Sequence, residues 1–304
     1  MKNKYIVLND SGITALINPL NGQLVSLFLR RELIHPGGRF SDDPKKDIDG
    51  WANSGLIMFP IVSASKDNVI SYDGKKYALD QHGMIRSLVP ICSLTNDVKL
   101  KMKTINRCIV KYHYKKNAKV NNIKYVKNKD TKGINPKVMH LPFSFDLSEE
   151  YYINAKEKRL EITTSIKNTS KKTFCYALGR HPAFILDSNN YMDCAFYDSN
   201  GKEVITLPKL IELSKASAYI MHGAKSVIAH DNHSKKGVRV WTDFGNIMLW
   251  SPKENMFCIE PITDRVGNND IELDLSPRGS YRDVLYPDKT KKYHTMIMIE
   301  DKKK

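Results

Sequence analysis

The sequence is dominated by short segments of β-type residues, and helical periodicity is almost absent. Along Arg159–Ile166, apolar and polar residues alternate, which is the period of a strand with one buried face. Asn21-Gly22 and Asp73-Gly74 each separate two β-type segments, and these dipeptides are typical of tight hairpin turns. Many short strands joined by regular turns predict an all-β sandwich or barrel.

The length of the chain favours one domain. Its 304 residues are 41% hydrophobic, which is enough to bury a large core and argues against disorder. All-β folds of this size commonly form a single domain, so we expect one domain over residues 1–304. Helical turns are expected only over 54–60 and 207–213. The Lys/Asn-rich segment at about 115–138 is expected to be a long loop inserted between two strands.

The charge balance is strongly basic, with 48 Lys and Arg against 33 Asp and Glu, or +15. Such an excess raises the possibility of a nucleic-acid or anionic membrane partner. The densest basic segment, Lys115–Lys137, contains Tyr125 as its single aromatic residue, whereas single-strand binders interleave several aromatic side chains. Lysine also outnumbers arginine, the residue that bidentate recognition prefers. We therefore expect a solvated lysine-rich surface, with no nucleic acid and no membrane as partner.

Two further features of the sequence indicate the cellular compartment of the protein. No run of about 18 apolar residues is present, so no membrane-spanning helix is expected, and the N-terminal residues lack the apolar region of a secretory leader. The five cysteines are scattered, odd in number and without a CxxC pair. This pattern predicts neither a disulfide framework nor a zinc knuckle and favours the cytoplasm.

Three segments place an ionisable residue beside a turn-forming residue. They are Asp80–Arg86 with His82, Leu178–Phe184 with His181, and Phe257–Pro261 with Glu260. Glycine lets the backbone bend close to a ligand and proline fixes the exit from a strand, and strand ends are common positions for site residues. A lone histidine there is usually a hydrogen-bonded structural residue, and Glu260 could equally be a solvated strand end. Each segment alone is therefore weak evidence.

An ordered set of short motifs is more specific than any one of them. The set consists of Phe59-Pro60-Ile61, Tyr72-Asp73-Gly74-Lys75, Gln81-His82-Gly83, His181-Pro182-Ala183-Phe184, Leu249-Trp250-Ser251 and Cys258-Ile259-Glu260-Pro261. In this order the motifs resemble the aldose 1-epimerase (galactose mutarotase) family, in particular its LacX-like bacterial branch. The resemblance covers roughly residues 10 to 299.

The resemblance implies a fold, a reaction and a set of roles. It implies a galactose-mutarotase-like β-supersandwich with a wide cleft on a concave sheet, no cofactor, and interconversion of the α and β anomers of an aldose. By position, Glu260 matches the catalytic base and His181 the catalytic acid. His82 matches the second histidine, which hydrogen-bonds the sugar near its reacting end.

The chemistry of anomer exchange asks for residues of these types. Ring opening takes a proton from the anomeric hydroxyl and gives one to the ring oxygen, and reclosure on the other face reverses both transfers. A carboxylate accepts protons at neutral pH and a histidine can donate and recover one. Each positioned acid or base contributes about 10²–10⁴-fold. No metal and no covalent nucleophile is needed for these steps.

Two sugar-binding positions depart from the family pattern. The arginine expected after the Phe-Pro element falls near Ala64, where Lys66 is a less directional substitute. The sugar-binding aspartate falls near Ala216–Tyr219, which contains no carboxylate, and Asp243 is a fallback without motif support. These departures put the usual sugar preference in doubt.

Other side chains are candidates for substrate contacts. Arg180 precedes the acid histidine where the family usually has glycine, so we hypothesise that Arg180 and Arg86 face the cleft and favour an anionic sugar, such as a sugar phosphate. Alternatively, Arg180 points to solvent and Arg86 pairs with a structural carboxylate. Trp250 is either a platform for a sugar face or a core residue.

Two functions remain open at the level of sequence. The first is an aldose 1-epimerase that uses Glu260, His181 and His82. The alternative is a non-catalytic carbohydrate-binding protein of the same fold, which the two missing sugar contacts favour. The sequence does not indicate an oligomeric state.

Overall fold

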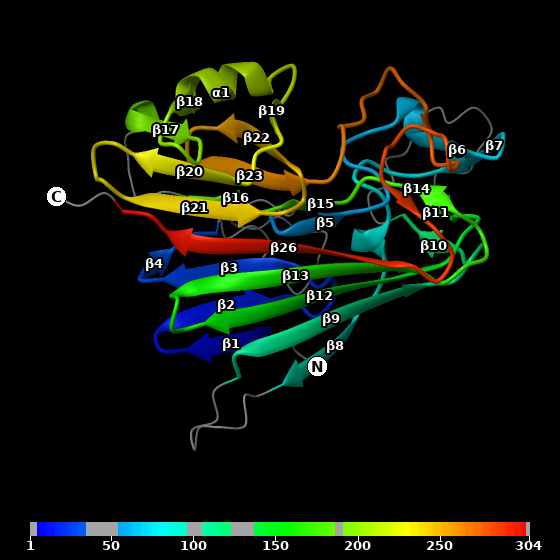
Figure 1. The fold of residues 1–304 in the computed structure, drawn as a ribbon, viewed down its shortest axis with the longest axis horizontal. Helices are drawn as coiled ribbons and strands as arrows, with labels where there is room; N and C mark the ends of the chain where they lie inside the picture. Colours follow the sequence, from blue (N-terminus) through cyan, green and yellow to red (C-terminus); the bar gives the residue numbers. More distant parts are fainter. Residues whose placement is uncertain (1–4, 35–53, 96–104, 123–136, 186–190, 302–304) are drawn as a thin grey trace.

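The protein folds almost entirely into β-strands, which confirms the all-β prediction. The computed structural model describes residues 5–34, 54–95, 105–122, 137–185 and 191–301. Within these residues the largest sheet has nine strands, and Figure 1 shows its long strands running side by side. In spatial order they are β18 (Glu203–Thr206), β17 (Cys194–Tyr197), β20 (Ser226–Asp231), β21 (Gly237–Thr242), β26 (Thr290–Ile299), β13 (Arg159–Asn168), β12 (Phe145–Asn154), β9 (Arg107–Tyr114) and β8 (Ile91–Thr95).

A second sheet contains the strands that bear the candidate site residues. In spatial order its strands are β19 (Tyr219–His222), β22 (Asn246–Lys253), β23 (Met256–Ile262), β15 (Gly179–His181) and β5 (Leu56–Met58), and β16 (Ala183–Phe184) also pairs with β23. The predicted helical turn over 54–60 is wrong, because Leu56–Met58 pair with β15 as a strand. The helical turn predicted over 207–213 is confirmed by α1 (Leu207–Ser214).

The remaining elements flank these two sheets. An N-terminal sheet contains β1 (Ile6–Asp10), β2 (Ile13–Ile17), β3 (Leu24–Leu29) and β4 (Arg31–Glu32). Smaller groups are β6 (Val69–Tyr72), β7 (Lys75–Ala78) and β24 (Leu273–Asp274); β10 (Val120–Asn121) and β11 (Val138–Met139); and β14 (Phe174–Cys175) and β25 (Val284–Leu285). Short 3₁₀ turns are η1 (Lys66–Asn68), η2 (Ile85–Ser87) and η3 (Tyr191–Asp193).

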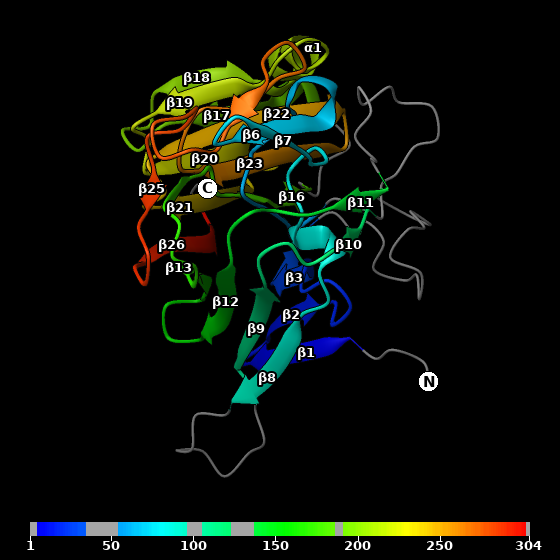
Figure 2. The same ribbon diagram turned by 90° about the vertical axis from the view of Figure 1, so that its right-hand side faces the viewer.

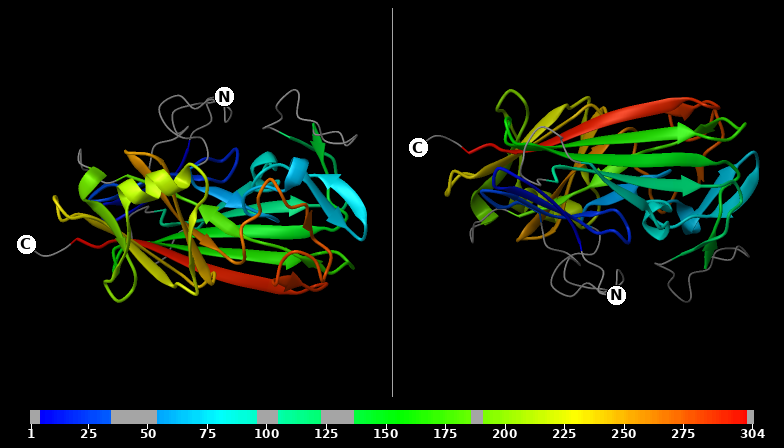
Figure 3. Two further views of the ribbon diagram at one scale, coloured as in Figure 1. Left: turned by 90° about the horizontal axis from the view of Figure 1, so that it is seen from above. Right: turned by 90° about the horizontal axis from the view of Figure 1, so that it is seen from below.

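The core lies between the nine-stranded sheet and a layer formed by the second sheet and the N-terminal sheet. Buried residues alternate with partly or fully exposed ones along all ten residues of both β12 and β13, as expected for strands with one buried face. Phe59, which directly follows β5 of the second sheet, packs on Phe145 of β12 with ring centroids 4.8 Å apart. The N-terminal sheet contacts β12 through β1 and β2, and the view from below in Figure 3 shows it against the long strands. Figure 2 places α1 and β8 at opposite ends of the molecule.

The expected long loop at about 115–138 is only partly described. Val120–Asn121 and Val138–Met139 pair as β10 and β11, so both ends of this segment contain strand residues rather than loop alone. Residues 123–136, which include most of the Lys/Asn-rich sequence, lie outside the described residues.

Within the part of the chain that the structure describes, no helix has the length and apolar character needed to cross a membrane.

Candidate functional site

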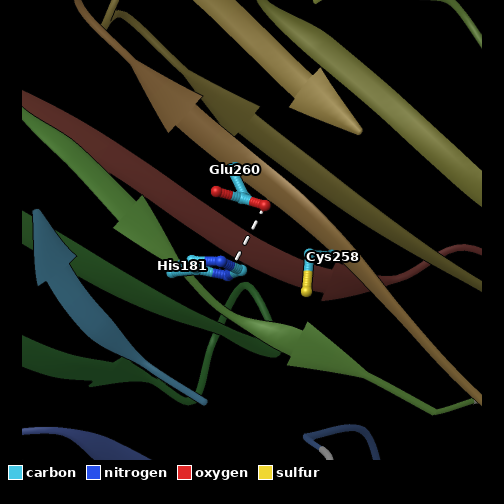
Figure 4. Close-up of side chains that lie close together, drawn as sticks. All are labelled: His181, Cys258 and Glu260. Atoms are coloured by element: carbon cyan, nitrogen blue, oxygen red, sulfur yellow. Dashed lines mark ion pairs between the residues drawn. The ribbon is translucent and has the colours of Figure 1, made fainter. Parts of the chain in front are cut away.

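Strand register brings His181 and Glu260 together. Strand β15 pairs antiparallel with β23 through Gly179 and Ile262, and Ala183 of β16 pairs with Cys258. This register places His181 directly across from Glu260. The His181 Nδ1 atom lies 3.5 Å from Oε1 of Glu260, as the dashed line in Figure 4 marks.

His82 reaches the same place from a tight turn. Its backbone has φ +65° and that of Gly83 has φ +79°, a left-handed conformation that favours glycine. A Cβ atom at Gly83 would overlap the carbonyl oxygen of Phe59, so this turn requires glycine on steric grounds as well. The His82 and His181 rings meet edge to face with centroids 5.3 Å apart.

The backbone of Ser63 fixes the orientation of the His82 ring. The His82 N–H donates to the Ser63 carbonyl oxygen at 2.7 Å, and the Ser63 N–H donates to His82 Nδ1 at 3.1 Å. Because Nδ1 accepts this hydrogen bond, a neutral His82 ring bears its proton on Nε2. His82 therefore offers a donor at Nε2.

These three residues line one pocket of about 780 Å³. Trp250 lines it too, with its ring centroid 6.0 Å from that of His181. Most of the other lining side chains are small or uncharged, and Lys215 is the one cation among the described lining residues. The remaining lining residues are Ser63, Ala64, Asn68, Gln81, Ser214, Ala216, Ser217, Ala218, Ile220, Met248, Val266, Gly267, Asn268 and Asn269.

Glu260 is in an unusually apolar position for a carboxyl group. Its side chain is 0% exposed, and neither of its oxygens has a hydrogen-bond partner among the residues that the structure describes. Burial raises the pKa of this carboxyl group well above its ordinary value of 4.5, because removal from water disfavours the charged form. A carboxylate in such a place is a stronger base than an exposed one.

Arg180 does not face the cleft, contrary to the cleft-facing hypothesis. Successive residues of a strand point to opposite faces, so Arg180 points away from the pocket that His181 lines. Its guanidinium is buried between the sheets, where it forms an ion pair with Glu149 of β12 and lies 3.5 Å from the Tyr151 hydroxyl. Thr164 donates to the same carboxylate at 2.6 Å. The solvent-facing alternative is equally wrong, since Arg180 is 1% exposed.

Arg86 and Asp243 are also absent from the described pocket lining. Arg86 is buried, which lowers its pKa to about 10, and its guanidinium donates to the carbonyl oxygen of Gln81, so it supports the turn that presents His82. Asp243 lies in the connection after β21, where its carboxylate accepts a hydrogen bond from the His294 N–H at 2.6 Å. Both residues therefore have structural roles.

The positions of the two missing sugar contacts do line the pocket. Ala64 stands where the arginine is expected, and Ala216, Ser217 and Ala218 stand where the aspartate is expected. The pocket wall at both places is therefore formed by small side chains, which supply no charged group.

Cys258 lies beside the His181–Glu260 pair, a position that the spacing of the cysteines does not predict. It lies two residues before Glu260 on β23, so both side chains share one face of the strand. Its thiol is fully buried, which raises its pKa well above the ordinary value. The period-two rule applied to Glu260 predicts this shared face.

Comparison with solved structures identifies the fold. A galactose mutarotase-like protein from Lactobacillus casei superposes with a TM-score of 0.72 at 16% identity, covering 98% of this chain and 100% of the other. A galactose mutarotase related enzyme from Lactobacillus acidophilus gives 0.66 at 18% identity, covering 98% of each chain. A galactose 1-epimerase from Lactobacillus acidophilus gives 0.66 at 13% identity, covering 98% of this chain and 95% of the other. No family model and no curated protein matches the chain. At these identities the likeness establishes the galactose mutarotase-like fold that the motif resemblance predicted.

Proposed function

We propose that the protein is an aldose 1-epimerase that interconverts the α and β anomers of an aldose by general acid–base catalysis. The observation that supports this most directly is the pairing of His181 Nδ1 and Glu260 Oε1 at 3.5 Å on the wall of a pocket large enough for a sugar. The ring oxygen and the anomeric hydroxyl of a pyranose are both bonded to C1. An acid and a base that serve these two oxygens must therefore lie close together, as these two do.

In the proposed mechanism, Glu260 accepts the proton of the anomeric hydroxyl while His181 donates a proton to the ring oxygen. The C1–ring oxygen bond breaks and the electron pair of the anomeric O–H bond forms the carbonyl of the open-chain aldose. Rotation about C1–C2 presents the other face of the carbonyl. The ring hydroxyl then attacks C1, His181 recovers its proton, and Glu260 returns the proton to the new anomeric hydroxyl.

Burial of Glu260 supports the role of base. Its raised pKa matches the carboxyl group more closely to the proton it exchanges at neutral pH, which is the condition for efficient general-base catalysis. Enclosure of the pair also strengthens the electrostatic interactions of the site.

His82 is proposed to orient the sugar. Its Nε2–H donor is set by the hydrogen bond from Ser63 to Nδ1, and its ring lies beside His181. One hydrogen bond of this kind contributes about 0.5–1.5 kcal/mol, so His82 acts mainly through orientation. The ring centroid of Trp250 lies 6.0 Å from that of His181, and Trp250 supplies an apolar ring on which the C–H face of a pyranose can pack.

The described lining favours an uncharged aldose over an anionic one. The anionic hypothesis depended on Arg180 and Arg86, whose guanidinium groups are used within the fold. The one described cation of the lining, Lys215, pairs with the carboxylate of Glu212, and both side chains are largely exposed. We propose a neutral sugar as the substrate.

We also propose that the protein is located in a reducing compartment, because all five cysteines are free thiols.

A non-catalytic sugar-binding protein is the second candidate. The observation in its favour is the pocket wall formed by Ala64 and Ala216, at positions where the family has sugar contacts. Binding alone, however, does not require an acid and a base that face each other.

Polarimetry of freshly dissolved α anomers of a panel of neutral aldoses, with and without the protein, tests the proposal. We expect faster decay of the optical rotation for at least one sugar, at the same final rotation. Calorimetric titration with the same sugars separates the two candidates. Sugar binding without any acceleration across the panel would replace the enzyme with the binding protein.

A further inference from the structure

The side chains of His181, Cys258 and Glu260 form a compact cluster of three different ligand atoms. An imidazole nitrogen, a thiol sulfur and a carboxylate oxygen, one from each residue, all lie within 4.8 Å of one another. All three side chains are buried. Figure 4 shows Cys258 and Glu260 on one strand, β23, and His181 facing them from β15.

Anomer exchange leaves part of this cluster without a role. The proposed proton transfers use His181 and Glu260 and make no use of the thiol of Cys258. Both oxygens of Glu260 are buried without a hydrogen-bond partner among the described residues. A buried polar atom in this condition costs free energy, and a ligand at the cluster would satisfy it.

We propose that His181, Cys258 and Glu260 form a binding site for a thiophilic divalent cation such as Zn²⁺. Nitrogen, sulfur and oxygen donors are the ligand set that Zn²⁺ takes in proteins, and sites with three protein ligands keep a fourth position open. Here the open position faces the pocket, because His181 and Glu260 both line it. A thiolate and a carboxylate together would balance the charge of the cation.

The distances require little rearrangement. Tetrahedral zinc with ordinary bond lengths separates its ligand atoms by about 3.4–3.6 Å. The 3.5 Å between His181 Nδ1 and Glu260 Oε1 already has this value. The sulfur of Cys258 lies at most 4.8 Å from the other two ligand atoms, so it must approach by at most about 1.4 Å to reach the zinc separations, a movement that side-chain rotation can supply.

This site would make the enzyme sensitive to metal ions. A cation at the cluster occupies both groups of the proposed acid–base pair, so sugar turnover and metal binding exclude each other. The inhibition rests on the proposed function, whereas the binding of the cation does not.

Titration of the chelator-treated protein with Co²⁺, in the absence of sugar, tests the site. We expect one equivalent of Co²⁺ to bind with a thiolate-to-cobalt charge-transfer absorption, and Zn²⁺ to displace it. The variant C258S should lose the absorption and bind at least about 100-fold more weakly. E260Q should weaken binding by at least about tenfold. The matched control C92S, which removes a thiol of β8 outside the pocket, should bind as the wild type does.

No thiolate absorption in the wild-type protein, unchanged affinity in both C258S and E260Q, or loss of binding in C92S would each overturn the proposal. Circular dichroism of each variant verifies that it is folded, and E260Q keeps the test decisive if C258S does not fold. Because no sugar is present, failure of the metal site and failure of the proposed enzymatic function are read out separately.

Discussion

Replacing Glu260 with glutamine should abolish the proposed anomerisation and, at neutral pH, make the fold more stable. The carboxyl group is 0% exposed, its oxygens lack hydrogen-bond partners among the described residues, and burial raises its pKa well above 4.5. A folded-state pKa above the unfolded one means that the folded protein holds this proton more tightly. The group's contribution to stability is therefore full below the unfolded pKa and is lost as pH rises toward the folded pKa.

The size of the effect follows from this linkage. Between the unfolded pKa of 4.5 and the folded pKa, the wild type should lose about 1.4 kcal/mol of unfolding free energy relative to E260Q for each pH unit. Glutamine has the same shape as the protonated acid and does not ionise, so the two proteins should be about equally stable at pH 4. Above the folded pKa the difference should become constant.

Urea denaturation of both proteins at half-unit steps from pH 4 to pH 8 measures the difference. The variant E157Q, which changes an exposed glutamate in the turn between β12 and β13, is the matched control and should follow the wild type at every pH. Parallel plots of unfolding free energy against pH for E260Q and the wild type would refute the assignment of a buried, destabilising carboxyl group. A lower unfolding free energy for E260Q at pH 7 would refute it too. The expected result is a trade of stability for function at this position.

Three further outcomes are expected. R180M should lose roughly 3–5 kcal/mol of unfolding free energy in urea denaturation because it leaves Glu149 buried without its partner, and the double variant R180M/E149M should recover most of it; equal losses in both would contradict the ion-pair argument. H82A should lower kcat/KM in the anomerisation assay by up to about tenfold, the value of one hydrogen bond, and a loss as large as that of H181A would show that His82 does more than orient the sugar. G83A should lower both the thermal midpoint and kcat/KM, because its Cβ would overlap the carbonyl oxygen of Phe59; a variant with wild-type values would remove the steric argument for this turn.

Local patterns in the sequence predict many of the strands and four of the residues that line the pocket, His82, His181, Trp250 and Glu260. The alternation along 159–166 corresponds to the alternating burial of β13, and the amphipathic segment at 207–213 forms α1. His82, His181 and Glu260 were found because each lies beside a turn former in an ordered set of motifs. These signals are local in sequence, so they can be recognised without knowledge of the tertiary structure.

Contacts between the two sheets could not be predicted in this way. Glu149 occupies a core-facing position of β12, and its partner Arg180 comes from the opposite layer. No sequence pattern links these two positions, so Arg180 beside the acid histidine looked like a cleft residue. Strand alternation from His181 places Arg180 on the opposite face of β15, away from the pocket.

The segment 54–60 shows a related limit. Within this segment, the three residues of β5, Leu56–Met58, are all buried, because both faces of this strand are covered. A short, uniformly apolar run has no period, so it does not distinguish a buried strand from a helical turn. Pairing with β15 decides between them, and that partner lies more than a hundred residues away in the sequence.

The rate of anomer exchange in the wild type, H181A and E260Q tests the central claim most directly. Magnetisation exchange between the α and β anomeric protons of an aldose that the protein binds, followed by NMR, measures this rate at equilibrium. The variants H113N and E157Q, at exposed positions, are the matched controls. We predict that the wild type and both controls accelerate exchange, and that H181A and E260Q each lose about 10²–10⁴-fold while remaining folded. Wild-type rates in both H181A and E260Q would show that the facing histidine and carboxyl group do not transfer the protons.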